Sequence, residues 1–324
     1  MANDNGLCQV AAALQKASRL LLLGHVSPDG DSLGSLTALR QILLRQGKAA
    51  HIFVAEGCPA RYQFLPGSDS IISDLADLPT RLDTVVVLDC GEWDRTGLEA
   101  ERFQQQLVVN IDHHRTSQGL GHANYLDSDA AATGMLILKL CDYWQVEIDG
   151  PVATCLYTAI AGDTGFFQHS NTTAVVHEAA ARLLAAGANQ ALVVENLQSK
   201  TPAFLQALNL VLKRLSSFLG GKGAYSFLTA ADLQRLGLHR SELEGLVDYP
   251  RSLMGVQLAA LLVEIEPGKF KVSLRSRAPW DVSAVAATLG GGGHSQAAGC
   301  TLLGTLEECI ERLTAATVEV VLLQ

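Results

Sequence analysis

Short, mainly apolar runs alternate with helical patterns along the first half of the chain. The runs at residues 20–23, 51–55, 84–88 and 107–111 each predict a buried strand. Leucines at 33, 36, 39 and 43 follow helical spacing, which predicts a helix over residues 32–46 that ends at Gly47. Strands that read as continuous Val, Ile and Leu runs are typical of parallel sheets buried on both faces. The alternation therefore predicts an α/β domain with a mainly parallel sheet flanked by helices.

The pattern changes in the second half of the chain. Residues 131–219 are mostly helical, and the Gly-Gly-Lys-Gly run at 220–223 is the best boundary. Beyond it we expect a strand at 224–229, a hairpin of strands 256–265 and 270–276, and a helix over 281–289. These elements predict a smaller α/β domain with a mixed sheet. We therefore expect an N-terminal domain over residues 1–190, a helical connector over 191–221 and a second domain over 222–324.

The net negative charge of the chain limits which nucleic acids it could bind. The chain has 24 Lys and Arg against 33 Asp and Glu, a net charge of −9, and the excess lies in the first 200 residues, with 13 basic and 22 acidic side chains. Nonspecific affinity for long nucleic acid comes from cations that face phosphates. An acidic protein is therefore a poor candidate for binding long or duplex nucleic acid, whereas metal ions could neutralise a local cluster of carboxylates.

The cysteines and the first residues of the chain predict its cellular compartment. The seven cysteines include no CxxC pair, so we expect them to be reduced and mostly buried, as in a cytoplasmic protein. The first 18 residues carry Asp4 and lack an unbroken apolar stretch, which argues against a signal peptide. The run at 20–23 is too short to span a bilayer, so we expect no membrane association.

Potential metal ligands gather where three of the predicted strands end. In an open α/β sheet, ligands bind outside the carboxyl ends of the strands. Any one of these side chains could be a turn residue or a helix cap, but their joint placement favours a site. The residues that follow the runs at 20–23, 84–88 and 107–111 are His25, Asp29, Asp31, Asp89, Asp112, His113 and His114.

A further aspartate, Asp163, ends the helical pattern over residues 152–161 and could approach the same place. Imidazoles with several carboxylates and no thiolate suit Mn²⁺ and also Mg²⁺, Fe²⁺ or Co²⁺, and they argue against structural zinc. Two metal ions about 3.5–4 Å apart are a common device for phosphoester hydrolysis. The inventory therefore predicts a two-metal phosphoesterase.

The second domain contains a candidate phosphate site. Four glycines at 290–293 precede His294, and glycine backbones can approach a phosphate closely and present N–H groups to it. Arg275 and Arg277, near the end of a predicted strand, could supply a guanidinium. The alternatives are a flexible turn and solvated edge charges.

These motifs together resemble the DHH phosphoesterase superfamily. The matching segments are GHVSPDGDS at 24–32, the strand-terminal Asp89, Asp112-His113-His114 and GDTG at 162–165. VSLRSR at 272–277 with GGGGH at 290–294 is similar to the DHH-associated C-terminal domain. A chain of two such domains most resembles the nanoRNase (oligoribonuclease) and pAp-phosphatase group.

The resemblance implies a role for each motif. Two divalent ions, Mn²⁺ in the first place, would share the carboxylate of Asp89. Asp112 would orient a ligand, and His114 would face the scissile phosphate. The other metal ligands would be His25 and Asp29 for one ion and Asp31, His113 and Asp163 for the second, while Arg275, Gly292, Gly293 and His294 would bind the substrate's other phosphate or nucleotide.

The resemblance also implies the reaction. A hydroxide held by both metals would attack phosphorus, which releases 5′-mononucleotides from short single-stranded RNA and dinucleotides and removes the 3′-phosphate of pAp. An active-site cleft between the domains would exclude long duplexes, and a homodimer is expected. Two alternatives remain: a cyclic-dinucleotide or pGpG phosphodiesterase, and a metal-containing nucleotide sensor without turnover.

Overall fold

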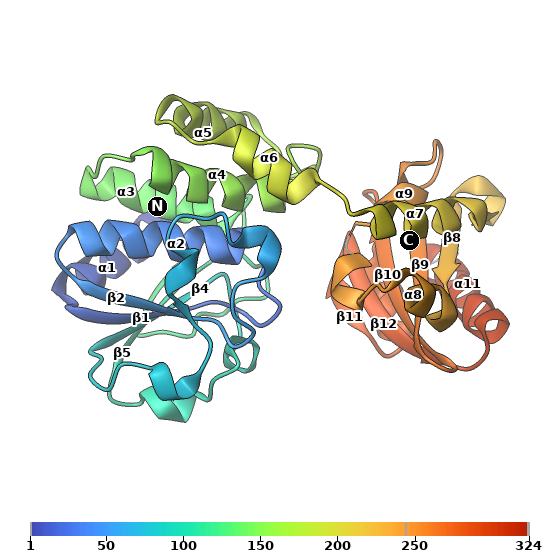
Figure 1. Ribbon diagram of the computed structural model, residues 1–324, viewed down its shortest axis with the longest axis horizontal. Coiled ribbons are helices and arrows are strands. Elements are labelled where there is room, and N and C mark those ends of the chain that lie inside the picture. Colours follow the sequence, from blue (N-terminus) through green and yellow to red (C-terminus); the bar gives the residue numbers. More distant parts are fainter. Residues whose placement is uncertain (1, 244, 323–324) are drawn as a thin grey trace. The chain divides into compact units, whose positions relative to one another are not determined.

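The computed structural model describes residues 2–243 and 245–322. The chain folds into two compact units, Met1–Ser199 and Lys200–Gln324, each with its own six-stranded sheet and core (Figure 1). The glycine run at 220–223 lies within the second unit, where residues 220–222 belong to the connection between the first two strands and Gly223 begins the second strand.

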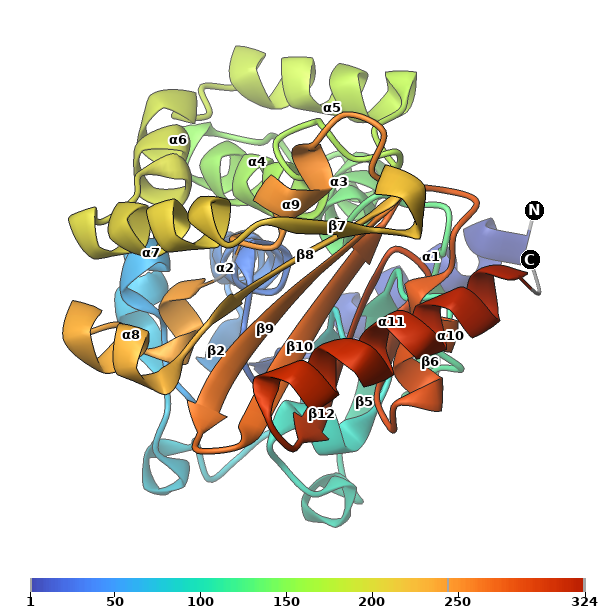
Figure 2. The same ribbon diagram turned by 90° about the vertical axis from the view of Figure 1, so that its right-hand side faces the viewer.

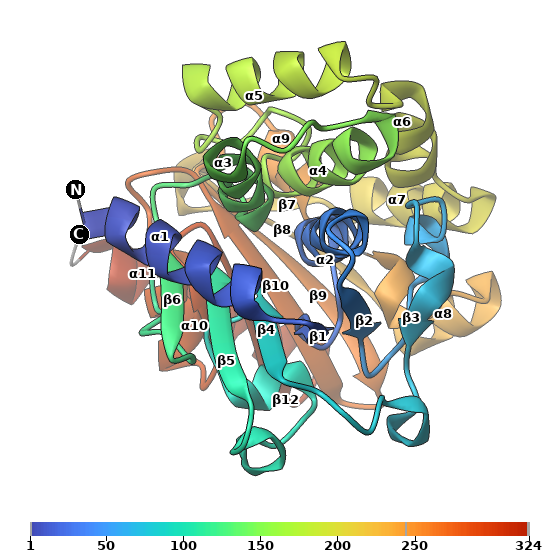
Figure 3. The same cartoon turned by 90° about the vertical axis from the view of Figure 1, so that its left-hand side faces the viewer.

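The sheet of the first unit is entirely parallel, as the apolar runs predicted (Figure 3). Its strand order is β3-β2-β1-β4-β5-β6. The two edge strands were not predicted, because β3 has two residues and β6 is only half-buried, so neither forms a continuous apolar run. The strands are β1 (Arg19–Leu23), β2 (Ala49–Phe53), β3 (Ile71–Ile72), β4 (Thr84–Leu88), β5 (Leu107–Asp112) and β6 (Ala123–Leu126).

Both faces of this sheet are covered, which explains the unbroken apolar strands. Leu20 and Leu22 of β1 pack into the core formed with the long helices, whereas Leu21 and Leu23 face the other side, against short 3-10 turns and loops. Two further helices pack outside α4. The helices are α1 (Ala2–Lys16), α2 (Gly30–Arg45), α3 (Thr133–Trp144), α4 (Gly150–Asp163), α5 (Ala174–Ala185) and α6 (Gln190–Gln198).

Helices α2 and α4 approach each other closely at Gly34. A Cβ at this position would lie 2.4 Å from the carbonyl oxygen of Cys155 and 3.0 Å from the Cβ of Ala159. Only glycine permits this approach. Its consequence is that Asp31, at the start of α2, and Asp163, at the end of α4, belong to two helices that are tightly packed together.

The second unit has a mixed sheet of order β11-β12-β10-β9-β8-β7, in which β8 and β9 are parallel and the other pairs antiparallel. Helices α10 and α11 cover one face, and α7 and α8 cover the other face over β8 and β9 (Figure 2). The strands are β7 (Ser216–Phe218), β8 (Gly223–Leu228), β9 (Leu258–Glu266), β10 (Lys269–Ser276), β11 (Gly292–His294) and β12 (Ala297–Leu303); the helices are α7 (Pro202–Lys213), α8 (Ala230–Leu236), α9 (Asp248–Ser252), α10 (Val282–Thr288) and α11 (Leu306–Leu322).

The glycine run at 290–293, for which the sequence left a flexible turn as an alternative, is partly a strand. Its second half and His294 form the edge strand β11, because the backbone of these residues pairs with β12 across a tight hairpin. Among the residues that the structure describes, no helix combines the length and apolar character needed to cross a membrane.

Candidate metal centre

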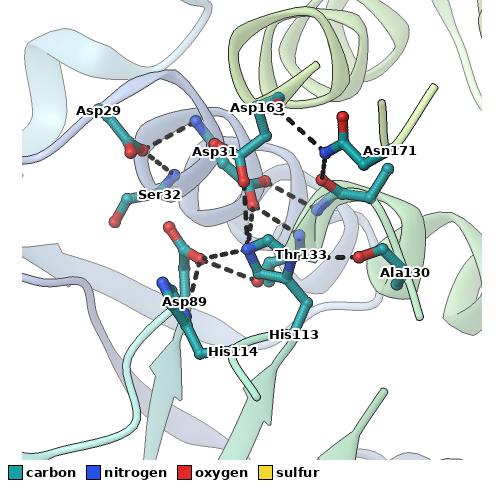
Figure 4. Close-up of polar contacts among 12 residues, drawn as sticks. Asp29, Asp31, Ser32, Asp89, His113, His114, Ala130, Thr133, Asp163 and Asn171 are labelled. Carbon is teal, nitrogen blue, oxygen red and sulfur yellow. Dashed lines mark hydrogen bonds and ion pairs between the residues drawn. The ribbon is translucent and has the colours of Figure 1, made fainter. Parts of the chain in front are cut away.

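The polar residues that follow β1, β4 and β5 meet at the carboxyl edge of the parallel sheet (Figure 4). This is the point where the strand order reverses between β1 and β4, which is where open α/β sheets bind ligands. The nitrogen and oxygen atoms form three overlapping groups, within each of which the atoms lie within 4.8 Å of one another. The groups are His25, Asp29 and Asp89; Asp31, His113 and Asp163; and Asp89, His113 and His114.

Asp89 lies at the centre of the cluster. Its Oδ2 is 3.5 Å from Nε2 of His25, and its Oδ1 is 3.5 Å from Nε2 of His113. Oδ1 also accepts a hydrogen bond from the Thr133 hydroxyl at 3.1 Å. Burial opposes ionisation, but the two histidines outweigh it and hold the Asp89 pKa below its usual range. The two oxygens of one buried carboxylate thus face two separate ligand groups.

Asp31 is fully buried and is held by main-chain groups of α3. It accepts hydrogen bonds from the amides of Thr133 at 2.6 Å and Gly134 at 2.9 Å, and from the Ser35 hydroxyl at 3.1 Å. The N-cap residue of helix α3, Ala132, makes no side-chain capping hydrogen bond. Asp31 lies on α2, but its carboxylate therefore caps the first amides of α3, which is the role that an N-cap side chain ordinarily has. Burial and the neighbouring charges of Asp89 and Asp163 raise the Asp31 pKa.

The ring orientations of His25 and His113 are set by carbonyl groups. Nδ1 of His25 lies 2.8 Å from the carbonyl oxygen of Val26, and Nδ1 of His113 lies 3.2 Å from that of Ala130. Each Nε2 is thereby directed at the carboxylates, as in metal sites whose histidines are oriented by a hydrogen bond to the other nitrogen. Burial opposes protonation, but the carboxylates raise the pKa of His25 to about 11 and of His113 to about 12.

The adjacent histidine, His114, points differently. Its ring is tilted by 57° to that of His113, and its Nδ1 lies 2.7 Å from Oδ1 of Asp112. Burial opposes protonation of His114, but the Asp112 carboxylate raises its pKa. Asp112 is buried and orients His114 rather than joining any of the three ligand groups.

Asp163 reaches the cluster from the end of α4. Its side chain is 26% exposed and lies 3.1 Å from Nε2 of His113. Burial raises its pKa to about 6, with His113 opposing the shift and Asp29 and Asp89 adding to it. The amide of Asn171 donates to the carbonyl oxygens of Asp163 at 3.1 Å and Ala131 at 3.2 Å, which ties the end of α4 to the segment before α3.

Thr133, Ala130 and Asn171 are the residues of this site that sequence reasoning missed. They act through a hydroxyl, a carbonyl and an amide side chain, so their residue types carry no metal-ligand signal. The candidate ligands themselves offer carboxylate oxygen and imidazole nitrogen without thiolate, and four of them are carboxylates gathered in one place. This donor chemistry fits divalent cations.

Comparison with known families agrees with this chemistry. The model for the DHH family N-terminal domain matches residues 19–160, and the model for the DHHA1 domain matches residues 220–321. The Thermus thermophilus protein named bifunctional oligoribonuclease and PAP phosphatase NrnA is 36% identical over 298 residues, which cover 91% of this chain and 88% of that protein. The chain belongs to the DHH family.

One further relative and one solved structure are also similar to this DHH protein. The cyclic-di-AMP phosphodiesterase PdeA of Listeria monocytogenes is 25% identical over 334 residues, which cover 95% of this chain and 49% of that protein. The crystal structure of an exopolyphosphatase-related protein from Bacteroides fragilis has a TM-score of 0.90 at 24% identity and covers 98% of this chain and 96% of that one. This likeness shows the fold.

In the DHHA1 domain, Arg275 and His294 share one row of the sheet. Arg275 on β10 and His294 on β11 both have Ala297 of β12 as their cross-strand partner. Directly paired residues project from the same face, so the two side chains stand on one face with a single small residue between them. Gly292 is exposed, and a Cβ there would meet nothing within 4 Å, whereas one at Gly293 would lie 2.6 Å from the carbonyl oxygen of Ala297.

Proposed function

We propose that this protein is a two-metal phosphoesterase that hydrolyses short single-stranded RNA to 5′-mononucleotides and removes the 3′-phosphate of pAp. The observation that carries the proposal is the position of Asp89, whose two oxygens face two separate groups of histidine and aspartate. The substrates are those in the name of the Thermus thermophilus relative, which matches nearly the whole chain.

Two of the three groups, the one with His25 and the one with Asp31, define the ligand sets. His25 and Asp29 would hold one ion, with Oδ2 of Asp89 facing them. Oδ1 of Asp89 would complete the other set, whose remaining members are Asp31, His113 and Asp163. Mn²⁺ is the ion we propose, because hard carboxylates mixed with imidazole suit it. When bound, such ions lower the pKa of a water molecule and neutralise charge on phosphoryl oxygens.

The chain's own residues orient the substrate. Asp112 fixes the ring of His114 through Nδ1, and its carboxylate raises the pKa of His114 against the effect of burial, which favours the cationic form of the ring. We assign Nε2 of His114 to a non-bridging oxygen of the scissile phosphate. Arg275, Gly292, Gly293 and His294 would bind the second phosphate or the nucleotide, which the shared row of Arg275 and His294 on the DHHA1 sheet supports. A few placed cations of this kind suit short substrates rather than long duplexes.

The test is chromatography of the products from metal-stripped protein reloaded with Mn²⁺. The substrates are pApA, pAp and cyclic di-AMP at equal concentration. We expect AMP from the first two and no turnover by Asp89→Ala. Asp94→Ala is the matched control, since Asp94 is an exposed aspartate in the following 3-10 turn and should keep full activity.

Other outcomes would redirect the assignment. Preferred hydrolysis of cyclic di-AMP would favour a cyclic-dinucleotide phosphodiesterase, the activity named for the Listeria relative. Binding of pAp without any product would indicate a nucleotide sensor. Full activity of Asp89→Ala would refute the shared carboxylate and with it the two-metal centre.

A further inference from the structure

Asn110 is a polar residue in the middle of the buried strand β5, where its neighbours Val109 and Ile111 belong to the apolar core. Its exposure is 0%. A buried amide is costly unless its hydrogen bonds are made. Here the Nδ2 group donates to the carbonyl oxygens of Val87 and Cys90, both at 3.1 Å, and Oδ1 accepts from the amide of Leu120 at 3.2 Å. Both amide protons and the oxygen are therefore used.

The two carbonyl groups that Asn110 binds lie on either side of Asp89. Strand β4 ends at Leu88, and Asp89 then adopts a left-handed backbone with φ of 57°. Residues other than glycine rarely adopt this conformation, because Cβ approaches the carbonyl oxygen too closely. The amide of Asp89 donates to the carbonyl oxygen of Ile111 at 3.0 Å. Strand β5 thus holds the turn at Asp89 by one main-chain bond and two bonds from the Asn110 side chain.

The direction of the Asp89 carboxylate depends on this turn. In the left-handed conformation the side chain reaches 3.5 Å from both His25 and His113. Rotation of φ to the ordinary negative range would swing Cβ away from this position relative to the sheet. The bond from Asn110 to Cys90 opposes that rotation, because it anchors the residue that follows Asp89.

We propose that Asn110 is a positioning residue that holds Asp89 in its left-handed turn and thereby sets the affinity of the metal centre. The proposal rests on the proposed function in one respect, the assignment of Asp89 as the shared metal ligand. Under this proposal the metal centre requires more than its ligand residues. It also requires a side-chain amide donor on β5 that is directed at the end of β4.

The test compares Asn110→Leu with Asn124→Leu in the 324-residue chain. Asn124 is the cross-strand partner of Asn110 on β6, and the hydrogen bonds of its amide go to the main chain of Gly121. Calorimetric titration of metal-stripped protein with Mn²⁺ measures affinity directly. We expect Asn110→Leu to weaken Mn²⁺ binding by about 10–100-fold, the range for residues that orient metal ligands. Asn124→Leu should bind Mn²⁺ as the wild type does.

Turnover of pApA separates positioning from direct ligation. Excess Mn²⁺ should restore turnover to Asn110→Leu, because every ligand is still present, but not to Asp89→Ala. If Asn110→Leu fails to fold, as judged by circular dichroism, Asn110→Ser takes its place with the same expectation. Wild-type Mn²⁺ affinity in a folded Asn110 variant would overturn the proposal. A wild-type protein that binds no Mn²⁺ would instead refute the metal centre itself.

Discussion

Replacement of Gly34 by alanine should destabilise the protein even though alanine is the better helix former. In the interior of an exposed helix, replacing glycine by alanine stabilises the helix by about 1 kcal/mol. Here the new Cβ would lie 2.4 Å from the Cys155 carbonyl oxygen, and real Cβ atoms essentially never come within 3.0 Å of such a neighbour. Both atoms belong to packed helices, so we place the overpacking cost near its upper value of about 3 kcal/mol. The net loss is then about 2 kcal/mol.

The same substitution should weaken the metal centre. Relief of the clash requires α2 and α4 to separate by at least about half an ångström, which is the tolerance of a preorganised site. Asp31 on α2 and Asp163 on α4 belong to one ligand group, so their spacing changes with the helices. Calorimetry should show reduced Mn²⁺ affinity for Gly34→Ala.

Urea denaturation followed by circular dichroism measures the stability change. Ala181→Gly, at an exposed position of α5, calibrates the helix propensity and should cost about 1 kcal/mol without any effect on Mn²⁺ binding. Equal or greater stability of Gly34→Ala relative to the wild type would refute the reasoning, because propensity would then outweigh the contact between the helices.

Three further predictions test other parts of the molecule. Thr133→Val should lower Mn²⁺ affinity and Thr133→Ser should retain it, since the hydroxyl donates to Asp89; equal affinities would contradict this role. Mn²⁺ at a hundredfold excess over its Kd should stabilise the wild type by about 2.7 kcal/mol for each ion bound, and a melting temperature that does not rise would count against binding. Burial opposes ionisation of Asp232, but Arg214 lowers its pKa to about 2. The ionised form therefore stabilises the fold by about 2 kcal/mol at neutral pH, and this is lost as pH falls from about 4 to 2. Asp232→Asn should lower stability at pH 7, and a deficit that persists unchanged at pH 2 would refute the assignment.

The sequence by itself determined the parallel sheet and the location of the site. Continuous apolar runs mark strands that are buried on both faces, and β1, β4 and β5 lie where such runs were recognised. Because parallel strands end at one edge of a sheet, polar residues directly after each run were bound to meet there. The positions of His25, Asp89 and His113 in the chain were therefore sufficient to predict that they share one site.

The tertiary structure decided how those residues are held. Asp31 caps α3 from 102 positions away in the chain, and Asn110 secures the backbone on both sides of Asp89. The glycine run before His294 became a strand through pairing with β12. All three arrangements use main-chain N–H and C=O groups, which every residue but proline carries in the same form. Residue type therefore does not mark them, and only the packing of distant segments shows which of these groups meet.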